Sequence, residues 1–475
     1  MTPLASLLLA VVTPFARIDA VPRIHVDARR GKDATGDGSA ELPFQTLAKA
    51  IALRAAMEEP WVEIALAVGF HGEASGEALP VLLPSGVRVV GAGSESCEFG
   101  GREGQPVVVL PKEGRVALES VALRGGSIGI ACEPGGRAPL AVELVDVRIE
   151  GSATALDLRS AAGPLALQAD GLRTRATGVG LHADAGAPLD LALRRCLFAG
   201  GEEGLLLDDG RAQADGPARE LWLSDCRFEG CANAGFVRRG GDGRERVALP
   251  WRFERCEFRG ARFGLALELP GGDVPLQVRD CRFEANGNFG ASLVGSGEVR
   301  EGATRFERCT FRWNGIGAQF LATGRPIEVD GCRFEDSIGI GLMVGNFTGA
   351  RASLRLRDSI VAANGATGLF VISERPDGLA VAVERCTLAD NRGAGVEKKN
   401  RKFGTSTLAL ARCVVAGHAT DLVKLDAAEF AGCHVGGDPR FRARERRDYR
   451  LADDSPARDA EGPLGAPAAA ARDGE

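Results

Sequence analysis

The sequence has no strong charge of either sign, no long apolar run and almost no tyrosine. Its 475 residues carry a net charge of −6, which gives no overall field that would attract nucleic acid or an anionic membrane. The longest apolar run, residues 4–12, is too short to span a bilayer. A single tyrosine, Tyr449, argues against a long carbohydrate cleft lined with aromatic rings. We therefore expect no nucleic-acid partner and no transmembrane segment.

The sequence also lacks a helical period between its repeats, which argues against alternating strand–helix units. Instead, one short pattern recurs every 23 to 30 residues. An apolar residue follows the first position of this pattern by two places at every step except Thr174, and one of the 64 glycines usually follows soon after. Aligned on Cys281, the first position (the marker) is held by Val121, Val147, Leu172, Cys196, Cys226, Cys256, Cys281, Cys309, Cys332, Ser359, Cys386 and Cys413.

A spacing of two places both side chains on one face of a strand. Short strands and turns at this period predict the coils of a parallel β-solenoid, in which equivalent residues stack about 4.8 Å apart. The marker cysteines would then form an internal ladder: Cys196, Cys226, Cys256, Cys281, Cys309, Cys332, Cys386 and Cys413. Asparagine tolerates a tight left-handed turn, so a second ladder is expected at a coil corner. Its members are Asn286, Asn314, Asn364 and Asn391.

The residues just before the marker alternate in charge from coil to coil. They read Asp225, Arg255, Asp280 and Arg308. Opposite charges stacked at strand spacing stabilise each other by a few tenths of a kcal/mol, roughly, per pair. This pattern explains much of the Arg and Glu content without any ligand. We therefore expect an active site to lie elsewhere than on this stretch of sheet.

These repeats resemble the pectate-lyase-like superfamily of single-stranded right-handed β-helices. Residues 24–55, with a strand, a Gly/Asp loop, Pro-Phe-x-Thr and an amphipathic helix, resemble the N-terminal segment of many secreted members. Residues 437–462 resemble the family's closing segment, which would cover the other end of the solenoid. The resemblance implies an all-β fold: a right-handed parallel β-helix of about twelve or more coils, with an N-terminal capping helix around 44–57.

The predicted organisation has five parts. Residues 1–20 are a candidate signal peptide, although no Lys or Arg precedes the apolar run. Residues 21–110 form the N-terminal cap and first coils, 111–436 the repeats, 437–464 the closing segment and 465–475 a disordered tail. A cleaved signal peptide would make the chain a secreted, cell-envelope or periplasmic protein.

The twelve cysteines show no CxxC pair and no Cys/His zinc spacing, so we expect no metal site. Ladder neighbours at strand spacing are farther apart than the Cβ separation of about 3.8 Å that a disulfide needs. We therefore expect buried, reduced thiols in the ladder. Four cysteines outside it could pair with one another, and no rule in the sequence selects the pairs: Cys97, Cys132, Cys231 and Cys433.

A basic segment at 397–403 holds three of the seven lysines in the chain. Lys398, Lys399, Arg401 and Lys402 follow Gly395-Val396, and we expect them on a loop that leaves a coil, where they could bind an acidic glycan. Lys398 and Lys399 are the candidate general bases of a lyase. An ordinary solvated loop is the alternative. Trp313, beside Asn314, is a candidate sugar-stacking residue.

Two functions fit the sequence. The first is an exported or cell-envelope β-helix protein that contacts polysaccharide and lacks a complete catalytic signature. The second is a polysaccharide lyase-like enzyme acting on a uronic-acid glycan; a glycoside hydrolase fits less well, because it needs paired carboxylates at a set separation. The fold alone does not decide between them. We expect a monomer without a resident cofactor, and Ca²⁺ only if the chain is a lyase.

Overall fold

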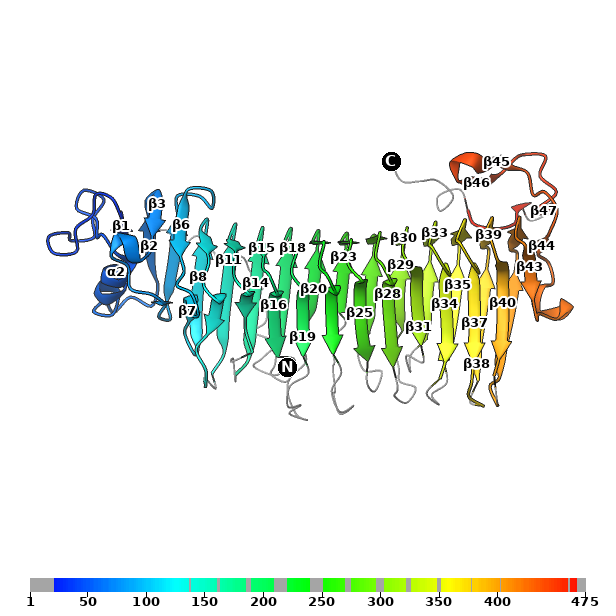
Figure 1. Ribbon diagram of the computed structural model, residues 1–475, viewed down its shortest axis with the longest axis horizontal. Helices are drawn as coiled ribbons and strands as arrows, with labels where there is room; N and C mark the ends of the chain where they lie inside the picture. The colour runs from blue at the N-terminus through cyan, green and yellow to red at the C-terminus, as the bar shows by residue number, and fades with distance from the viewer. Residues whose placement is uncertain are drawn as a thin grey trace. The chain divides into compact units, whose positions relative to one another are not determined.

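The computed structural model divides into two compact units, Met1–Glu220 (unit 1) and Leu221–Glu475 (unit 2), which are described separately. Figure 1 shows the strands of the coils as arrows. The residues that the structure describes are 21–135, 138–159, 163–184, 189–208, 220–239, 251–269, 275–295, 303–321, 326–347, 352–376, 378–401, 403–459 and 462–467. Both units are built from coils of a right-handed parallel β-solenoid. Each full coil contributes one strand to each of three parallel sheets, A, B and C, in that order. The predicted all-β fold class is therefore confirmed.

Unit 1 contains the first strands of each sheet. Its sheet A consists of β1 (Arg23–Val26), β2 (Val62–Leu66), β5 (Val87–Gly91), β8 (Gly114–Glu119), β11 (Leu140–Val145), β14 (Leu165–Asp170) and β17 (Leu189–Arg194). Its sheet B consists of β3 (Gly69–His71), β6 (Cys97–Gly100), β9 (Ala122–Arg124), β12 (Arg148–Glu150), β15 (Arg173–Arg175) and β18 (Leu197–Ala199). Its sheet C consists of β4 (Val81–Leu82), β7 (Pro106–Leu110), β10 (Ile128–Cys132), β13 (Thr154–Asp157), β16 (Val179–Asp184) and β19 (Glu203–Asp208).

Unit 2 repeats the same arrangement. Its sheet A consists of β20 (Leu221–Ser224), β23 (Trp251–Glu254), β26 (Leu276–Arg279), β29 (Thr304–Glu307), β32 (Ile327–Asp330), β35 (Ala352–Arg357), β38 (Leu379–Glu384) and β41 (Ser406–Ala411). Its sheet B consists of β21 (Arg227–Glu229), β24 (Glu257–Arg259), β27 (Arg282–Glu284), β30 (Thr310–Arg312), β33 (Arg333–Glu335), β36 (Ile360–Ala362), β39 (Thr387–Ala389), β42 (Val414–Ala416) and β44 (His434–Val435). Its sheet C consists of β22 (Ala234–Arg239), β25 (Phe263–Leu269), β28 (Phe289–Gly295), β31 (Ile316–Leu321), β34 (Leu342–Asn346), β37 (Leu369–Ser373), β40 (Ala394–Asn400) and β43 (Thr420–Val423).

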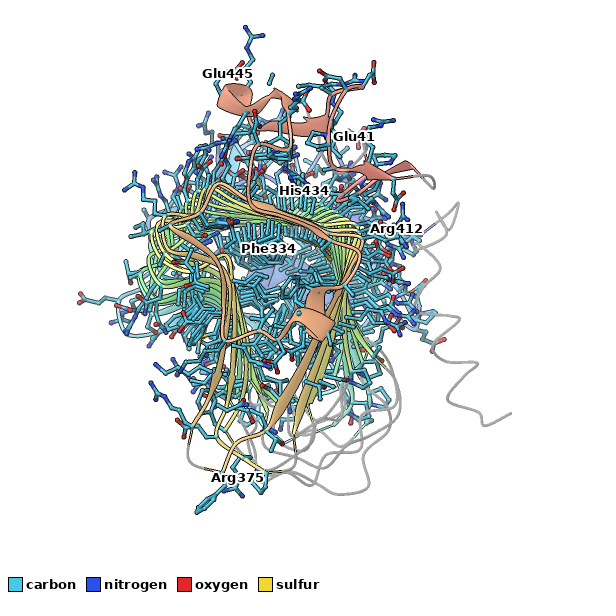
Figure 2. The ribbon with its side chains drawn as sticks, turned by 90° about the vertical axis from the view of Figure 1, so that its right-hand side faces the viewer. Glu41, Phe334, Arg375, Arg412, His434 and Glu445 are labelled. Atoms are coloured by element: carbon cyan, nitrogen blue, oxygen red, sulfur yellow. The ribbon has the colours of Figure 1, made fainter. Side chains whose placement is uncertain are left out.

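The interior of unit 2 is filled by in-register stacks of like side chains. The phenylalanine that follows each marker from Cys226 to Cys332 by two places points inward, and Figure 2 shows Phe334 in the interior. Along Phe258, Phe283, Phe311 and Phe334, successive ring centroids lie 4.9, 4.6 and 4.6 Å apart, with nearly parallel planes. Each stacked pair contributes about 0.5–1.5 kcal/mol beyond the burial of its area. Strand alternation thus places the apolar residues inside and leaves outward positions free to vary.

The marker cysteines lie at the corner between sheets A and B. The residue before each marker is in the left-handed region, as Asp280 (φ 54°) and Arg308 (φ 51°) illustrate. Cys281 is 1% exposed; its thiol donates to the carbonyl of Arg279 (3.3 Å) and accepts from the amide of Cys256 (3.4 Å). Burial raises the pKa of this thiol well above its ordinary value. All twelve cysteines are reduced thiols outside any disulfide, and Cys433 alone is half-buried.

The second ladder runs along the corner between sheets B and C. The amide of Asn286 donates to the side-chain oxygen of Asn314 (2.9 Å), and Asn314 donates to the carbonyl of Phe283 (2.8 Å). Asn364 and Asn391 repeat the contact at 2.8 Å. Gly290 leaves room for this ladder, because a Cβ there would lie 3.0 Å from the Asn314 amide nitrogen and 2.5 Å from the Gly317 carbonyl. The asparagine and glycine of the repeat therefore serve one corner.

The charges before the marker form ion pairs across neighbouring coils. Arg255 donates through two nitrogens to Asp225 (2.6 and 2.8 Å), and Arg308 does the same to Asp280 (2.7 and 2.8 Å). These bidentate contacts are exposed, so each contributes roughly 0–1 kcal/mol. These ion pairs connect each coil to its neighbour and leave little net charge at this corner.

The C-terminal segment packs on the outer face of sheet B in unit 2. Its elements are β45 (Phe441–Ala443), η4 (Arg444–Arg446) and β46 (Asp448–Leu451). Tyr449, at 1% exposure, lies against Ile360, Ala362 and Ala389, and Figure 2 places Glu445 outside the layer that His434 marks. Gly465 and Ala466, assigned above to a disordered tail, donate backbone hydrogen bonds to Arg412 and Thr387. The prediction that this segment covers the open end is corrected: it covers a side of the solenoid, because tyrosine and leucine find apolar outward positions there.

The predicted helix is present as α2 (Leu47–Arg54), which begins after the N-cap Thr46 and contacts β1 and β2. Its role as a cap remains a prediction. Among the residues that the structure describes, no helix is long and apolar enough to cross a membrane.

Substituting Asn314 by Leu should lower the free energy of unfolding by about 1–3 kcal/mol, because the Phe283 carbonyl and the Asn286 amide lose their partner in a buried corner. Urea unfolding measures the loss. Asn288→Leu is the matched control, since Asn288 is a half-buried corner residue whose side chain has no hydrogen bond among the described residues. Equal stability of the two variants would show that Asn314 is an ordinary turn residue.

Thiol labelling of the native chain should modify Cys433 first and leave Cys281 unreacted until the chain unfolds, because accessibility controls the reaction. The position of Cys231 at a coil corner in the sequence pattern predicts an accessible thiol, but the structure corrects this prediction: Cys231 is 1% exposed and should also be protected. Mass spectrometry of labelled peptides gives the order. Rapid native labelling of Cys281 would contradict the buried ladder.

Candidate functional site

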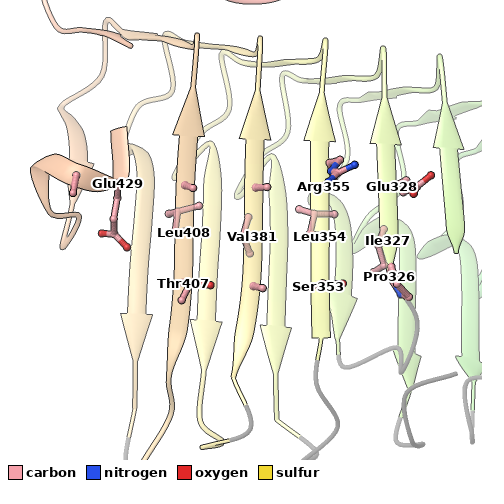
Figure 3. Close-up of a pocket in the computed structure, with 14 residues that line it drawn as sticks. Pro326, Ile327, Glu328, Ser353, Leu354, Arg355, Val381, Thr407, Leu408 and Glu429 are labelled. Carbon is pink, nitrogen blue, oxygen red and sulfur yellow. The ribbon is translucent and has the colours of Figure 1, made fainter. Parts of the chain in front are cut away.

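The outer face of sheet A in unit 2 carries an open pocket with a volume of about 670 Å³ (Figure 3). Strands β32, β35, β38 and β41 form its floor, and the short 3₁₀ helix η3 (Ala427–Phe430) contributes to its lining at one end. Pockets that bind small ligands usually have volumes of about 300–1,000 Å³. The pocket is therefore large enough for one or two sugar residues.

The floor of the pocket is low because its outward residues are small. Leu354, Val381 and Leu408 are buried. Between them, Ala382 and Ala409 continue the outward row of the sheet, and both are exposed. An alanine extends little beyond the backbone, so a flat ring can approach the sheet closely. The hydroxyls of Ser353 and Thr407, which also line the pocket, offer hydrogen bonds.

The pocket contains the guanidinium of Arg355, which the neighbouring side chains leave available to a ligand. Glu328 and Arg355 are register partners on β32 and β35 and lie close together in Figure 3. Arg305, on the opposite side of Glu328, donates to that carboxylate at 2.9 Å. Within the described part of the chain, the exposed Arg355 has no ion pair or side-chain hydrogen bond. Arg355 can therefore donate to a carboxylate of a ligand, in the bidentate geometry that guanidinium groups favour.

Glu429, on η3, lies at one end of the pocket and is bound to a residue of sheet C. Its two carboxylate oxygens accept hydrogen bonds from Lys398 at 2.6 and 2.7 Å. Burial acts to raise the pKa of Glu429, but the hydrogen bonds from Lys398 and the amide of Asp426 hold it below its ordinary value. Glu429 is therefore a carboxylate at neutral pH, and it is poorly suited to take or give a proton.

The basic segment does not form the expected loop. Residues 394–400 are strand β40, which pairs with β37 and β43. Lys398 is in register with the buried Val371 and lies on the inward face, where Glu429 offsets its charge. The prediction of a loop is wrong for a physical reason. Charged residues favour an exposed loop only where no partner supplies the opposite charge, and Glu429 supplies it here from another segment.

The other candidate residues are dispersed. Lys399 is half-buried on the outward face of sheet C, in register with Ile372. Arg401 forms an exposed ion pair with Glu374 at 3.4 Å, and Lys402 lies outside the described residues. Trp313 is 49% exposed at the corner between sheets B and C, with Arg312 stacked 4.4 Å from its ring centroid. Lys399, Arg401 and Trp313 do not line the pocket on sheet A. Their contact with a glycan remains a prediction.

Sequence reasoning missed Arg355, Glu328 and Glu429. The signal that could have found the pocket is the change from charged to small residues at the outward positions of sheet A. Earlier strands carry Arg305 and Glu307 there, whereas β38 and β41 read LAVAVE and STLALA. Among the described residues, no group of three or more His, Cys, Asp or Glu side chains is arranged to hold a metal ion.

Two family models match the chain. The model for the right handed beta helix region matches residues 223–408, and that for a protein of unknown function, DUF1565, matches residues 29–123. No curated protein matches the sequence. The first match covers most coils of unit 2, including β32, β35 and β38 of the pocket floor and the first half of β41.

Solved structures with similar chains are distant in sequence. The A-module of the mannuronan C-5 epimerase AlgE6 of Azotobacter vinelandii is 12% identical, with a TM-score of 0.43 over 82% of this chain and 94% of that chain. The catalytic domain of a GH87 alpha-1,3-glucanase in complex with nigerose is 10% identical, with a TM-score of 0.39 over 90% and 70%. The periplasmic alginate epimerase AlgG is 9% identical, with a TM-score of 0.36 over 82% of each chain.

Substituting Lys398 by Met should lower the free energy of unfolding by about 1–3 kcal/mol, because it leaves the Glu429 carboxylate, with a side-chain exposure of 17%, without its charged partner. Lys399→Met is the matched control: it removes the same charge from the neighbouring residue, which has no ion pair among the described residues. Urea unfolding compares the two. A larger loss for Lys399→Met would contradict the structural role of the Lys398–Glu429 pair.

Proposed function

We propose that the chain is a member of the pectate-lyase-like superfamily of right-handed parallel β-helices and that it binds an acidic polysaccharide along the outer face of sheet A in unit 2. The observation that carries the proposal is Arg355, an exposed guanidinium beside a floor of alanines. A uronic-acid residue offers the two matching features: a planar carboxylate for the guanidinium and a flat ring for the low floor. Glu328 does not oppose this binding, because Arg305 neutralises it.

The proposed activity is binding without catalysis. Cleavage of a uronic-acid glycan by elimination needs a general base near the sugar and a group that neutralises its carboxylate. Arg355 supplies the second requirement. For the first, the described lining of the pocket contains no His, Lys, Tyr or Cys, and the carboxylate of Glu429 is held by Lys398. For this reason we favour binding over catalysis. A lyase-like enzyme is the alternative, with Lys398 and Lys399 as its candidate bases and Ca²⁺ as its candidate ion.

We propose in addition that the chain is exported, to the cell envelope or beyond. The apolar run at residues 4–12 supports this proposal. N-terminal sequencing of the chain produced in its own cells tests it: a new N-terminus near residue 17 or 21 is expected after cleavage, and an intact chain that starts at Met1 and stays inside the cell would contradict it.

The glycan proposal predicts that Arg355→Ala weakens binding of uronic-acid polymers by about tenfold or more, because a charge-assisted bidentate contact is lost. Binding of the unchanged protein should weaken as salt rises, and a neutral glucan should not bind. Isothermal titration calorimetry with a panel of polyuronates measures both effects. Arg252→Ala is the matched control, because Arg252 is an exposed arginine in the same outward row of sheet A, outside the pocket.

Equal affinities of the Arg355→Ala and Arg252→Ala proteins would show that the pocket is not the binding site. Absorbance of unsaturated products during incubation with the same polymers tests the alternative. Turnover that is lost in Lys398→Ala or Lys399→Ala would establish a lyase in place of a binding protein.

A further inference from the structure

The pocket on the outer face of sheet A in unit 2 has two chemically different ends. Glu328 and Arg355 lie at one end, and Glu429 lies at the other, beyond Thr407 and Leu408 (Figure 3). In the sheet, β35, which carries Arg355, is followed by β38 and β41, and η3 contacts β41. The pocket therefore runs across the strands, in the direction in which the coils stack.

Two rows of outward side chains follow this direction on the floor of the pocket. The residues of each row are in register on β35, β38 and β41: Ser353, Ala380 and Thr407 in one row, and Arg355, Ala382 and Ala409 in the other. Neighbouring strands are about 4.8 Å apart, which is close to the length of one sugar residue. A disaccharide that extends along the rows therefore places one ring over Ala382 and the next over Ala409.

The described residues that line the pocket include one cation, Arg355. The ring over Ala382 lies beside this guanidinium, so a carboxylate on that ring can accept two hydrogen bonds from it. The ring over Ala409 lies one strand farther away, and it has no cation beside it among the described lining residues. A carboxylate on this second ring would thus have no partner of opposite charge.

The second ring instead lies towards the carboxylate of Glu429. This side chain is 17% exposed and lines the pocket, whereas Lys398, which binds both of its oxygens, lies on the inward face of sheet C and is not among the lining residues. The amide of Asp426 donates to one of the same oxygens at 2.9 Å. These bonds hold the carboxylate in place and ionised. Since an ionised carboxylate only accepts hydrogen bonds, it repels a second carboxylate and favours a hydroxyl group.

Thr407 adds a neutral polar group at the same end of the pocket. Its side chain is exposed, and its hydroxyl has no hydrogen bond among the described residues. A hydroxyl both donates and accepts, so that of Thr407 can bind the hydroxyl groups of a sugar from the other row of the floor. The end of the pocket at Glu429 therefore offers the contacts that a neutral sugar needs.

We propose that the pocket selects a glycan in which the uronic-acid residue at Arg355 is joined to a neutral sugar, whose hydroxyl groups face Glu429 and Thr407. The ligand is then an acidic heteropolysaccharide with neutral residues between its acids, and a polymer of uronic acids alone binds more weakly. The inference rests on the proposed function, because it takes the carboxylate to bind at Arg355. Its selectivity comes from the repulsion of the wrong ligand as much as from contacts to the right one.

The experiment compares three β-1,4-linked disaccharides by isothermal titration calorimetry on the full-length protein. Two of them contain one glucuronic acid and one glucose, in either order, and the third contains two glucuronic acids. The better of the two single-acid disaccharides should bind about tenfold more tightly than diglucuronic acid, because diglucuronic acid places a carboxylate beside Glu429 where the neutral sugar places a hydroxyl group.

Removing the charge of Glu429 should abolish this preference. Glu429→Gln alone would leave the ammonium group of Lys398 without its partner, so the variant is Lys398→Met/Glu429→Gln, which removes both members of the ion pair. In this protein the affinity for diglucuronic acid should rise to that of the single-acid disaccharides. Lys112→Met/Glu133→Gln is the matched control: it makes the same two substitutions at an exposed ion pair of unit 1, with a separation of 3.5 Å, and should keep the preference.

The outcomes separate this inference from the proposed function. If diglucuronic acid binds as tightly as both single-acid disaccharides, and Arg355→Ala weakens all three, the proposed function stands and the inference is overturned. A preference that the Lys398→Met/Glu429→Gln protein retains would overturn it as well. If no disaccharide binds, or Arg355→Ala weakens none of them, the proposed function fails and the inference fails with it. The comparison on the unchanged protein is decisive even if the double variant does not fold.

Discussion

The structure depends on in-register hydrogen bonding between successive coils. In a parallel sheet each strand gives and receives backbone hydrogen bonds at even spacing, so a coil must repeat the path of its neighbour closely. Within each unit the sheets pair residue for residue, as when Phe283 opposes Phe311. The corners follow from the same requirement. In unit 2 the residue before each marker, from Asp225 to Arg412, is in the left-handed region, and this residue is a glycine only at Gly331. A position that turns the chain in one coil must turn it in all.

This constraint divides the side chains into two classes. Inward residues are fixed by stacking, so leucine, phenylalanine and the corner asparagines recur with little freedom. Outward residues have no such restriction, and they carry the differences between the three faces of unit 2. On sheet B, Ile360 and Ala389 accept the C-terminal segment. On sheet A, Ala380, Ala382 and Ala409 leave the floor open beside Arg355. The three faces of unit 2 therefore differ in what they can contact because their outward residues differ.

The fold could be predicted from the sequence because its signals are local and repeated. Cys281 and Phe283 share a face at a spacing of two, and Asn286 follows at a fixed distance, so each coil shows its path within a few residues. The asparagine contacts at 2.8–2.9 Å and the buried thiol of Cys281 lie where this pattern placed them.

The site could not be predicted in the same way. Lys398 forms an ion pair with Glu429, which lies 31 residues away in the sequence. Arg355 can bind a ligand because Glu328 is bound to Arg305, 50 residues before Arg355 in the sequence. Such contacts depend on which outward residues of different coils become neighbours. A short stretch of sequence does not contain both partners, so it cannot reveal the contact.

The most direct test of this account is a crystal structure of the full-length protein with a uronic-acid oligosaccharide bound. The account predicts a sugar ring over Ala382 and Ala409, with its carboxylate within about 3 Å of the Arg355 guanidinium nitrogens. A sugar bound along sheet C beside Lys399, or at the Trp313 corner with the sheet A pocket empty, would contradict it.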